Sequence, residues 1–221
     1  MTPNNKQIRF TYKTPAFRLS YPALFEPQAV MGDETKKKYG VTMLFPKKSL
    51  VETMTAANHP AAKYMSKDNC AAIYQEICKV ARGNFGPEVD LKSLKLTKFR
   101  DGDKAKDSGK TDDNEKGYIV VRTSSNEKNK PQCIDQATKA ITDPTLLYPG
   151  CWVRAILTVA PFYKPQHGVT LYLVGIQKLA DDATFSSRPR VEDEFDAVAV
   201  EAVDPISNSG IEVPAENELP Y

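Results

Sequence analysis

Aromatic side chains stand beside basic ones at several points in this chain of 221 residues. In two segments that read as strands, Tyr118 lies four residues before Arg122, and Trp152 lies two residues before Arg154. Residues at even spacing share one face of a strand, so each pair would present a ring and a cation together. An exposed ring can stack on an unpaired base, while Lys and Arg bind phosphates. These residues therefore indicate a surface for single-stranded nucleic acid.

Further rings and cations extend this predicted surface. The other residues that we expect to contact nucleic acid are Lys36, Lys37, Lys38, Tyr39, Arg100, Tyr163, Lys164 and Tyr172. Two simpler interpretations remain open: a run of lysines can be a solvated turn, and an aromatic ring is as often part of the core as of a binding surface. We expect Phe45, Phe85 and Phe162 to be the first rings to be buried.

Charge is divided sharply along the chain. Residues 1–190 hold all 30 basic side chains and 19 acidic ones, a net charge of +11, whereas residues 191–221 hold nine acids and no base. A basic body with an anionic extension suits a protein that binds polyanions and can compete with them through its own tail. The alternative is an acidic solubilising tail on an unrelated domain.

The sequence offers little for catalysis or metal binding. The four cysteines form no Cys-x-x-Cys pair, and only His59 and His167 could assist them, so we expect reduced thiols, no metal site and no cofactor. The loop at residues 100–117 is rich in Asp and Gly, but it lacks a glutamate at the twelfth position of a calcium loop. We expect a long mobile loop there and no enzyme activity. A nuclease that uses the carboxylates between Asp101 and Asp113 is the alternative.

Strand signals dominate the body of the chain. Alternation and β-branched residues predict strands over residues 38–45, 117–125, 150–160 and 168–179, with the last two joined as a hairpin through residues 161–167. Strand-like pieces between residues 9 and 25 are interrupted by Pro15 and Pro22.

Two helices are expected between the early and the later strands. Ser49 and Glu52 have the spacing of a capping box, which predicts a helix from there to about Asn58. Apolar residues at four-residue spacing predict a second helix over residues 66–82, with Gly83 as its stop. About five strands with a helical insert fit a mainly β protein of the oligonucleotide-binding (OB) fold, a five-stranded Greek-key barrel.

Several segments carry a resemblance to a known family. The segments are FRLSYPALFEP (residues 17–27), the strand at residues 39–46, RDGD (residues 100–103), LYPGCWVRA (residues 147–155) and GVTLYLVGIQ (residues 168–177). In this order and spacing they resemble the phage-type single-stranded DNA-binding proteins, over roughly residues 8–185. The resemblance implies an OB-fold that shields single strands, without sequence preference, during phage DNA replication, recombination and repair. It implies neither a cofactor nor catalysis.

We therefore expect an OB-fold domain at residues 1–190 and a disordered acidic tail at residues 191–221. In such proteins an acidic tail that ends in an aromatic residue recruits replication enzymes, which implies a docking role for Leu219, Pro220 and Tyr221 toward replication or recombination proteins. Many relatives end in Phe, so Tyr221 departs from that pattern.

Other functions fit the same sequence. A strand-annealing recombination mediator would need the same groove, and a structural phage protein could use the same barrel. Edge strands could also pair two copies into a homodimer. The polar start of the chain and the absence of a long apolar run predict a cytoplasmic protein without a membrane segment.

Overall fold

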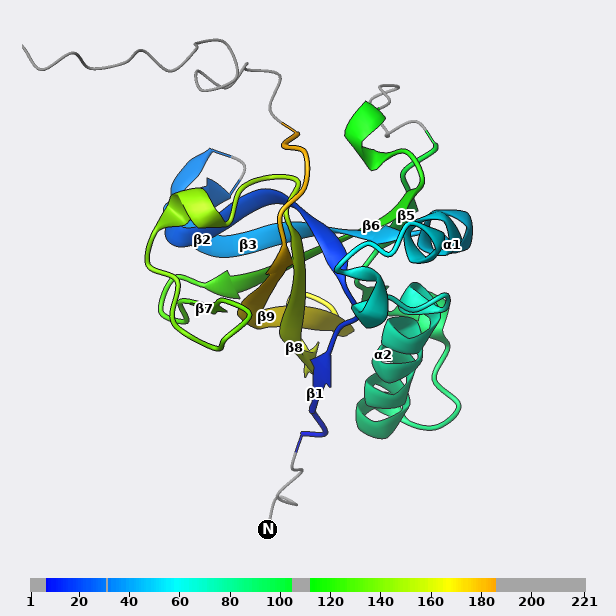
Figure 1. The fold of residues 1–221 in the computed structure, drawn as a ribbon. Coiled ribbons are helices and arrows are strands. Elements are labelled where there is room, and N and C mark those ends of the chain that lie inside the picture. Colours follow the sequence, from blue (N-terminus) through cyan, green and yellow to red (C-terminus); the bar gives the residue numbers. More distant parts are fainter. Residues whose placement is uncertain (1–6, 31, 105–111, 186–221) are drawn as a thin grey trace, which may run out of the picture. The chain divides into compact units, whose positions relative to one another are not determined.

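Five strands close into a barrel in the computed structural model, which describes residues 7–30, 32–104 and 112–185 (Figure 1). They are β2 (Phe17–Val30), β3 (Asp33–Pro46), β6 (Tyr118–Asn126), β8 (Trp152–Phe162) and β9 (Gly168–Ala180). Strand β2 pairs with β3 and β8, β3 pairs with β6, β6 pairs with β9, and β8 pairs with β9. This closed circuit is the OB-fold that the strand pattern predicted.

The predicted strands and hairpin are confirmed. Every barrel strand overlaps a segment that was predicted as a strand or as strand-like, and β8 and β9 form an antiparallel hairpin that closes with Phe162 opposite Gly168. Strand β2 continues through Pro22, because the register with β3 shifts between Ser20 and Ala23. A proline cannot donate to a ladder, and a bulge at that point removes the need for it to do so.

Short strands line the edges of the barrel. These are β1 (Phe10–Lys13), which pairs with β8, β4 (Lys95–Leu96), which runs parallel to β9, β5 (Phe99–Asp101), which pairs with β6, and β7 (Gln132–Ile134), which runs parallel to β9. Four 3-10 turns lie in the connections between the longer elements, at Ala62–Tyr64, Leu91–Ser93, Asp113–Glu115 and Pro144–Leu146. Strands β4 and β5 bring a segment that is distant in sequence onto the outer face of β6 and β9.

The barrel interior holds the main core. Val41, Met43 and Phe45 point inward from β3 and pack with Phe17 and Leu157, all nearly inaccessible to solvent. The opposite face of β3 is also covered, since Leu44 packs with Trp152 and Tyr118 in a second cluster. Phe45 is buried as expected, whereas Phe85 and Phe162 are only half-buried.

Two α-helices lie between β3 and β6. Helix α1 spans Lys48–Ala56 and α2 spans Asn69–Phe85; α2 packs beside β1, β8 and β9 (Figure 1). The predicted capping box is wrong, because Ser49 lies inside α1 and the N-cap residue is Lys47, whose side chain makes no capping hydrogen bond. Gly83 is not the stop of α2 either. The helix runs on to Phe85, and Gly86 (φ 108°) follows it.

The helical insert occupies an unexpected place in the barrel order. An OB-fold often carries its helix between the third and fourth strands, but here both α-helices separate the second strand, β3, from the third, β6. The same insert supplies β4 and β5. The connection therefore builds part of the outer surface of the barrel as well as covering its end.

The four cysteines are free thiols, with Cys133 and Cys151 buried. Burial raises the pKa of Cys151 and Cys70 to about 12, and that of Cys133 to about 11. In the described part of the chain, no helix is long and apolar enough to span a membrane. The same residues contain no cluster of three or more His, Cys, Asp or Glu side chains placed to hold a metal ion.

Candidate nucleic-acid interface

Two adjoining depressions hollow the outer face of β6 and β9. They have volumes of about 550 and 500 Å³ and share Arg122 of β6 and Thr170 of β9 in their linings. The first extends toward β4, β5 and Phe162, and the second toward the β2–β3 hairpin. Because they share residues, they form one continuous groove across the barrel.

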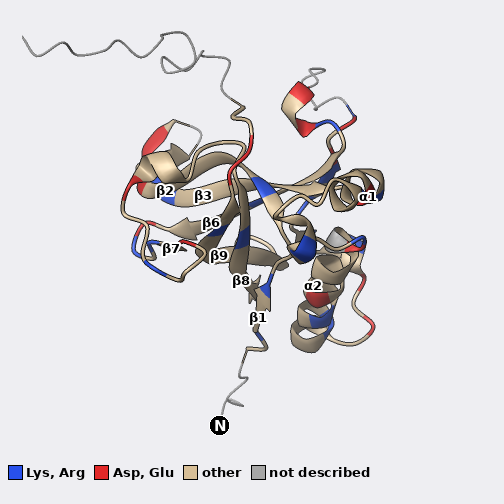
Figure 2. Cartoon of the chain, viewed as in Figure 1, with Lys and Arg blue, Asp and Glu red and all other residues tan. Residues whose placement is uncertain are grey.

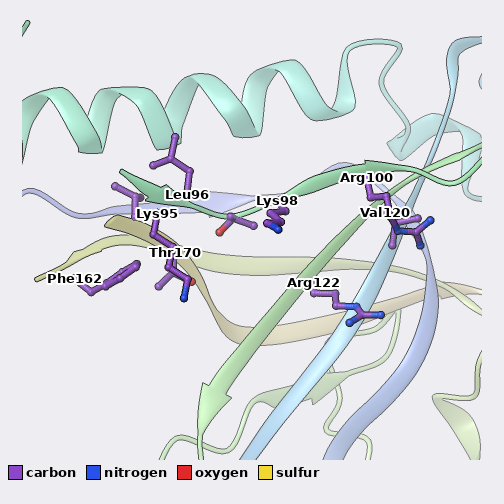
Figure 3. A pocket seen from close by; sticks show the side chains of 10 residues that line it. Lys95, Leu96, Lys98, Arg100, Val120, Arg122, Phe162 and Thr170 are labelled. Carbon is purple, nitrogen blue, oxygen red and sulfur yellow. The ribbon is translucent and has the colours of Figure 1, made fainter. Parts of the chain in front are cut away.

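Five basic side chains line this groove, and we call it the basic groove. They are Lys38, Lys95, Lys98, Arg100 and Arg122. Figure 3 shows Arg100 and Arg122 on neighbouring strands, with Lys95, Lys98, Thr170 and Phe162 along the rest of the first depression. No Asp or Glu of the described residues lines either depression. A concave surface with one sign of charge concentrates its field on an anionic ligand.

The sheet register explains how these cations come together. Arg122 lies opposite Thr42 on β3, and Arg100 lies opposite Val120 on β6, so both guanidinium groups start from adjacent strands. Lys95 reaches the same face because β4 runs parallel to β9 and places it opposite Gly168. Figure 2 shows basic residues along the barrel strands, whereas acidic residues lie mainly in loops and turns.

Four of the five cations carry uncompensated charge. Within the described ranges, Lys38, Lys95, Lys98 and Arg122 make no ion pair. Arg100 is the exception, because its guanidinium donates to the buried carboxylate of Glu115. That contact fixes the position of Arg100 at one end of the groove.

The base of the Asp-rich loop at residues 100–117 is anchored next to Arg100. The Lys47 ammonium donates to Asp101 Oδ1 and to Asp103 Oδ2, each at 2.5 Å. The ion pairs and hydrogen bonds with Lys47 lower the pKa of both carboxyl groups and raise the pKa of Lys47. The prediction of one long mobile loop is therefore wrong for its base; residues 105–111 lie outside the described residues.

One exposed ring lines the groove, and another lies in the loop that follows Phe162. Tyr21 lines the second depression with 65 % of its surface exposed. Its φ of 45° places it at the β2 bulge, which turns the side chain away from the core. Tyr163, in the β8–β9 loop, lines neither depression; it is 39 % exposed and contacts Phe85 edge-to-face at a centroid distance of 5.4 Å.

Three of the predicted contact residues are buried instead. Trp152 has no exposed surface, and its indole N–H donates to Asp182 Oδ2 at 2.7 Å. Tyr118 and Tyr39 are each 7 % exposed, although Tyr39 borders the second depression. A base needs an open ring face for stacking, so the expectation that Trp152 and Tyr118 stack is wrong. Both side chains point into the second core cluster, whereas the contact predicted for Tyr39 stays a prediction.

The remaining predicted residues divide between the groove and other surfaces. Lys38, Arg100 and Arg122 line the groove, whereas Lys36 and Lys37 form ion pairs with Asp33 and Glu34. Arg154 lines neither depression; it donates to Gln177 Oε1 and lies 4.8 Å from the centre of the Tyr64 ring.

Other predicted residues lie near the groove or outside the described part of the chain. Lys164 is exposed in the β8–β9 loop, and Tyr172 is half-buried on the outer face of β9. Leu219, Pro220 and Tyr221, together with the whole predicted tail, lie outside the described residues.

Sequence reasoning missed Tyr21, Lys95 and Lys98. A Tyr-Pro step inside a strand is a usable signal for a bulge, and a bulge re-aims the side chain beside it. Lys95 and Lys98 gave no such signal, because the parallel pairing of β4 with β9 is not visible in the local pattern.

Comparison with known proteins places this arrangement in a family. The sequence model of one family, described as Enterobacter phage Enc34, ssDNA-binding protein, matches residues 11–204. The chain belongs to this family. Its family model spans every barrel strand, both α-helices and part of the acidic segment. Among curated proteins, no sequence matches the chain.

Solved structures show the same fold. The single-stranded DNA-binding protein from bacteriophage Enc34 in complex with ssDNA has a TM-score of 0.57 and 22 % identity, over 80 % of this chain and 89 % of that chain. Its C-terminal truncation has a TM-score of 0.54 and 24 % identity, over 79 % of this chain and 88 % of that chain. Another structure of the Enc34 protein has a TM-score of 0.53 and 21 % identity, over 84 % of this chain and 90 % of that chain. The family member described here therefore shares the fold of the Enc34 protein.

Proposed function

We propose that this protein binds single-stranded DNA along the basic groove without preference for sequence. The observation that carries the proposal is a concave face with five basic side chains and no carboxylate, on the strands and loops through which OB-folds bind oligonucleotides. Membership of the family of the Enc34 ssDNA-binding protein, one structure of which is a complex with ssDNA, supports the same ligand.

The chemistry of the groove favours an unpaired strand. Lys38, Lys95, Lys98 and Arg122 would bind phosphates, while the exposed ring of Tyr21 offers a face to a base. Stacking contributes roughly 1–3 kcal/mol per base and tolerates every base, which gives affinity without sequence readout. In duplex DNA the bases already stack on each other, so the rings add little and single strands are preferred.

A titration with a matched charge control tests the proposal. Fluorescence anisotropy of a labelled dT oligomer should show tight binding that weakens with salt, because each neutralised phosphate contributes about −0.7 to the slope of log K against log [salt]. The double variant Lys38→Glu/Arg122→Glu should lose at least tenfold in affinity. Lys48→Glu/Lys139→Glu changes the net charge equally at exposed positions outside the groove.

Equal binding by both double variants would contradict the proposed groove. Duplex DNA and RNA oligomers of the same length serve as competitors in this titration. Competition by duplex as strong as that by the single strand would contradict the stacking part of the proposal.

We infer that such binding serves to cover exposed single strands during phage DNA replication, recombination and repair, as a binding protein and not as an enzyme. The acidic residues 191–221 would compete with DNA for the basic groove, since nine negative charges oppose a body of net charge +11. Their Leu219, Pro220 and Tyr221 end would dock replication proteins.

Deleting residues 191–221 tests the competition. The shortened chain should bind dT oligomers more tightly at low salt, and the gain should fade as salt screens the competing charges. If the deletion changes nothing at low salt, the tail does not compete with DNA, and its role is limited to docking.

A further inference from the structure

A third depression, with a volume of about 820 Å³, lies farther along the same outer face of β6 and β9. We call it the second groove. Arg9, Lys128 and Lys130 line it, together with Asn126, Asn129 and Tyr172. These residues come from the start of the chain, from the end of β6 and the turn after it, and from β9. None of the cations in this depression belongs to the basic groove.

The strand register joins the two grooves. Strands β6 and β9 run parallel, with Ser124 opposite Tyr172. Alternate residues of a strand share a face, so Ser124 and Asn126 lie on one face of β6, as Thr170 and Tyr172 do on β9. In each pair the first residue lines the basic groove and the second lines the second groove. The step along each strand is two residues, roughly 7 Å.

The second groove has the chemistry of a phosphate site. No Asp or Glu of the described residues lines it, and Glu127, the one acid in the adjacent turn, is absent from its lining. Lys128 and Lys130 form no ion pair with any described carboxylate. The exposed amides of Asn126 and Asn129 add neutral donors.

A buried polar group beside this groove also lacks a partner. Ser125 is 3 % exposed and lines the second groove, and its hydroxyl makes no hydrogen bond with the described residues. Buried hydroxyls are usually satisfied, so an unpaired one at the edge of a groove points to a ligand. Tyr172, half-buried at the junction, can offer a ring edge or face to a base that crosses there.

We propose that the second groove binds the continuation of the single strand that leaves the basic groove. This inference rests on the proposed function, and it extends the binding site past Tyr172 to the turn at residues 126–130. An oligomer that fills only the basic groove would not reach Lys128 and Lys130. A longer strand would bind both grooves and release more counterions.

Oligomer length separates the two grooves. Binding of dT oligomers of about 6 and about 20 nucleotides, lengths chosen around the usual range for one OB-fold, is measured for the full chain at several salt concentrations. Lys128→Ala/Lys130→Ala should weaken the longer oligomer about tenfold and reduce its salt slope by about 1.4, two phosphates at about 0.7 each. The shorter oligomer should bind as it does to the unaltered chain.

Three results would overturn the inference. One is an unchanged affinity for the longer oligomer, and another is an equal loss for both lengths, which would mean a general charge effect. Lys48→Ala/Lys139→Ala measures that general effect. The third is binding of a peptide of residues 191–221 to the unaltered chain but not to Lys128→Ala/Lys130→Ala, which would make the acidic segment the occupant.

Failure of the proposed function looks different in the same assay. If Lys38→Glu/Arg122→Glu leaves both oligomers bound as tightly as before, the basic groove is not the primary site. That variant could instead bind both oligomers more weakly while Lys128→Ala/Lys130→Ala binds both with unchanged affinity. In that case DNA binds in the basic groove, and the proposal for the second groove is wrong.

Discussion

The basic groove and the region around Trp152 use the same residue types in opposite ways. In the groove, Arg122 and Lys38 have no ion-pair partner among the described residues, and Tyr21 is largely exposed. Around Trp152, the indole and the neighbouring Arg18 guanidinium both have hydrogen-bond partners within the protein. Arg18 donates to the carbonyl oxygens of Gly150 and Ala183, and it lies 3.5 Å from Asp182 Oδ2.

The segment at residues 181–185 accounts for the second arrangement. Asp182 accepts a hydrogen bond from the Trp152 indole, and the Tyr148 hydroxyl bonds to Asp181 and to the Asp182 backbone. Gly150, with φ of 111°, lets this segment come close, since a Cβ there would lie 2.3 Å from the Ala183 carbonyl oxygen. A ring next to a cation therefore indicates binding only when neither one is satisfied internally.

Removing Trp152 should give the largest effect on stability. Trp152→Ala would leave a cavity in the second core cluster and remove the indole hydrogen bond to Asp182, which should lower the free energy of unfolding by about 3–5 kcal/mol. Urea denaturation measures the loss. The folded fraction should bind dT oligomers with nearly unchanged affinity. A loss of affinity without a loss of stability would show instead that Trp152 contacts the DNA.

The same comparison predicts the fluorescence of the single tryptophan. A buried indole should be shielded from iodide, and poly-dT should cause little direct quenching of it. Strong quenching by poly-dT, together with ready access to iodide, would contradict the burial of Trp152.

Tyr21 should matter for DNA and not for the fold. Tyr21→Ala removes an exposed ring at the groove and should weaken dT binding by roughly 1–3 kcal/mol, the usual value of one stacked base. Tyr21→Phe is the matched control, because it keeps the ring and removes only the hydroxyl group, so it should leave the affinity nearly unchanged. Anisotropy titrations measure both variants, and equal losses would show that the Tyr21 ring does not stack on a base.

Neighbouring lysines of β3 sharpen the comparison further. Lys38→Ala should reduce the salt slope by about 0.7, since Lys38 lines the groove without an ion-pair partner among the described residues. Lys36→Ala should change it little, because Lys36 is already paired with Asp33 at 2.8 Å. A larger effect at Lys36 than at Lys38 would show that the DNA path follows the hairpin tip and not the groove.

The smallest expected effect concerns the anchor at Lys47. The folded pKa values of Asp101 and Asp103 lie below their unfolded values, so the ion pairs stabilise the fold above the unfolded pKa. That stabilisation is lost as the pH falls below about 4, through the folded pKa. Lys47→Ala should therefore destabilise the protein slightly at neutral pH and leave its stability nearly unchanged at pH 2. NMR titration of the two carboxyl groups should show both pKa values rising in the variant.

The local pattern of residues was sufficient to predict the barrel strands. Alternation placed Val41, Met43 and Phe45 on one inward face of β3, and turn residues placed the β8–β9 hairpin. It was less informative for the helices. The capping-box pattern at Ser49 failed, because the N-cap is Lys47, two residues earlier, and no side-chain hydrogen bond caps the helix there.

What the sequence alone determined, then, is the strand content, the division of charge near residue 190 and the segments that mark the family. Tertiary structure decided which faces stay open. A two-residue period separates the two faces of a strand, but it does not show which face a distant segment will cover, as residues 181–185 cover Trp152. Nor does it show that β4 will bring Lys95 to the face of Arg122. Those outcomes depend on non-local pairing, which a stretch of neighbouring residues does not encode.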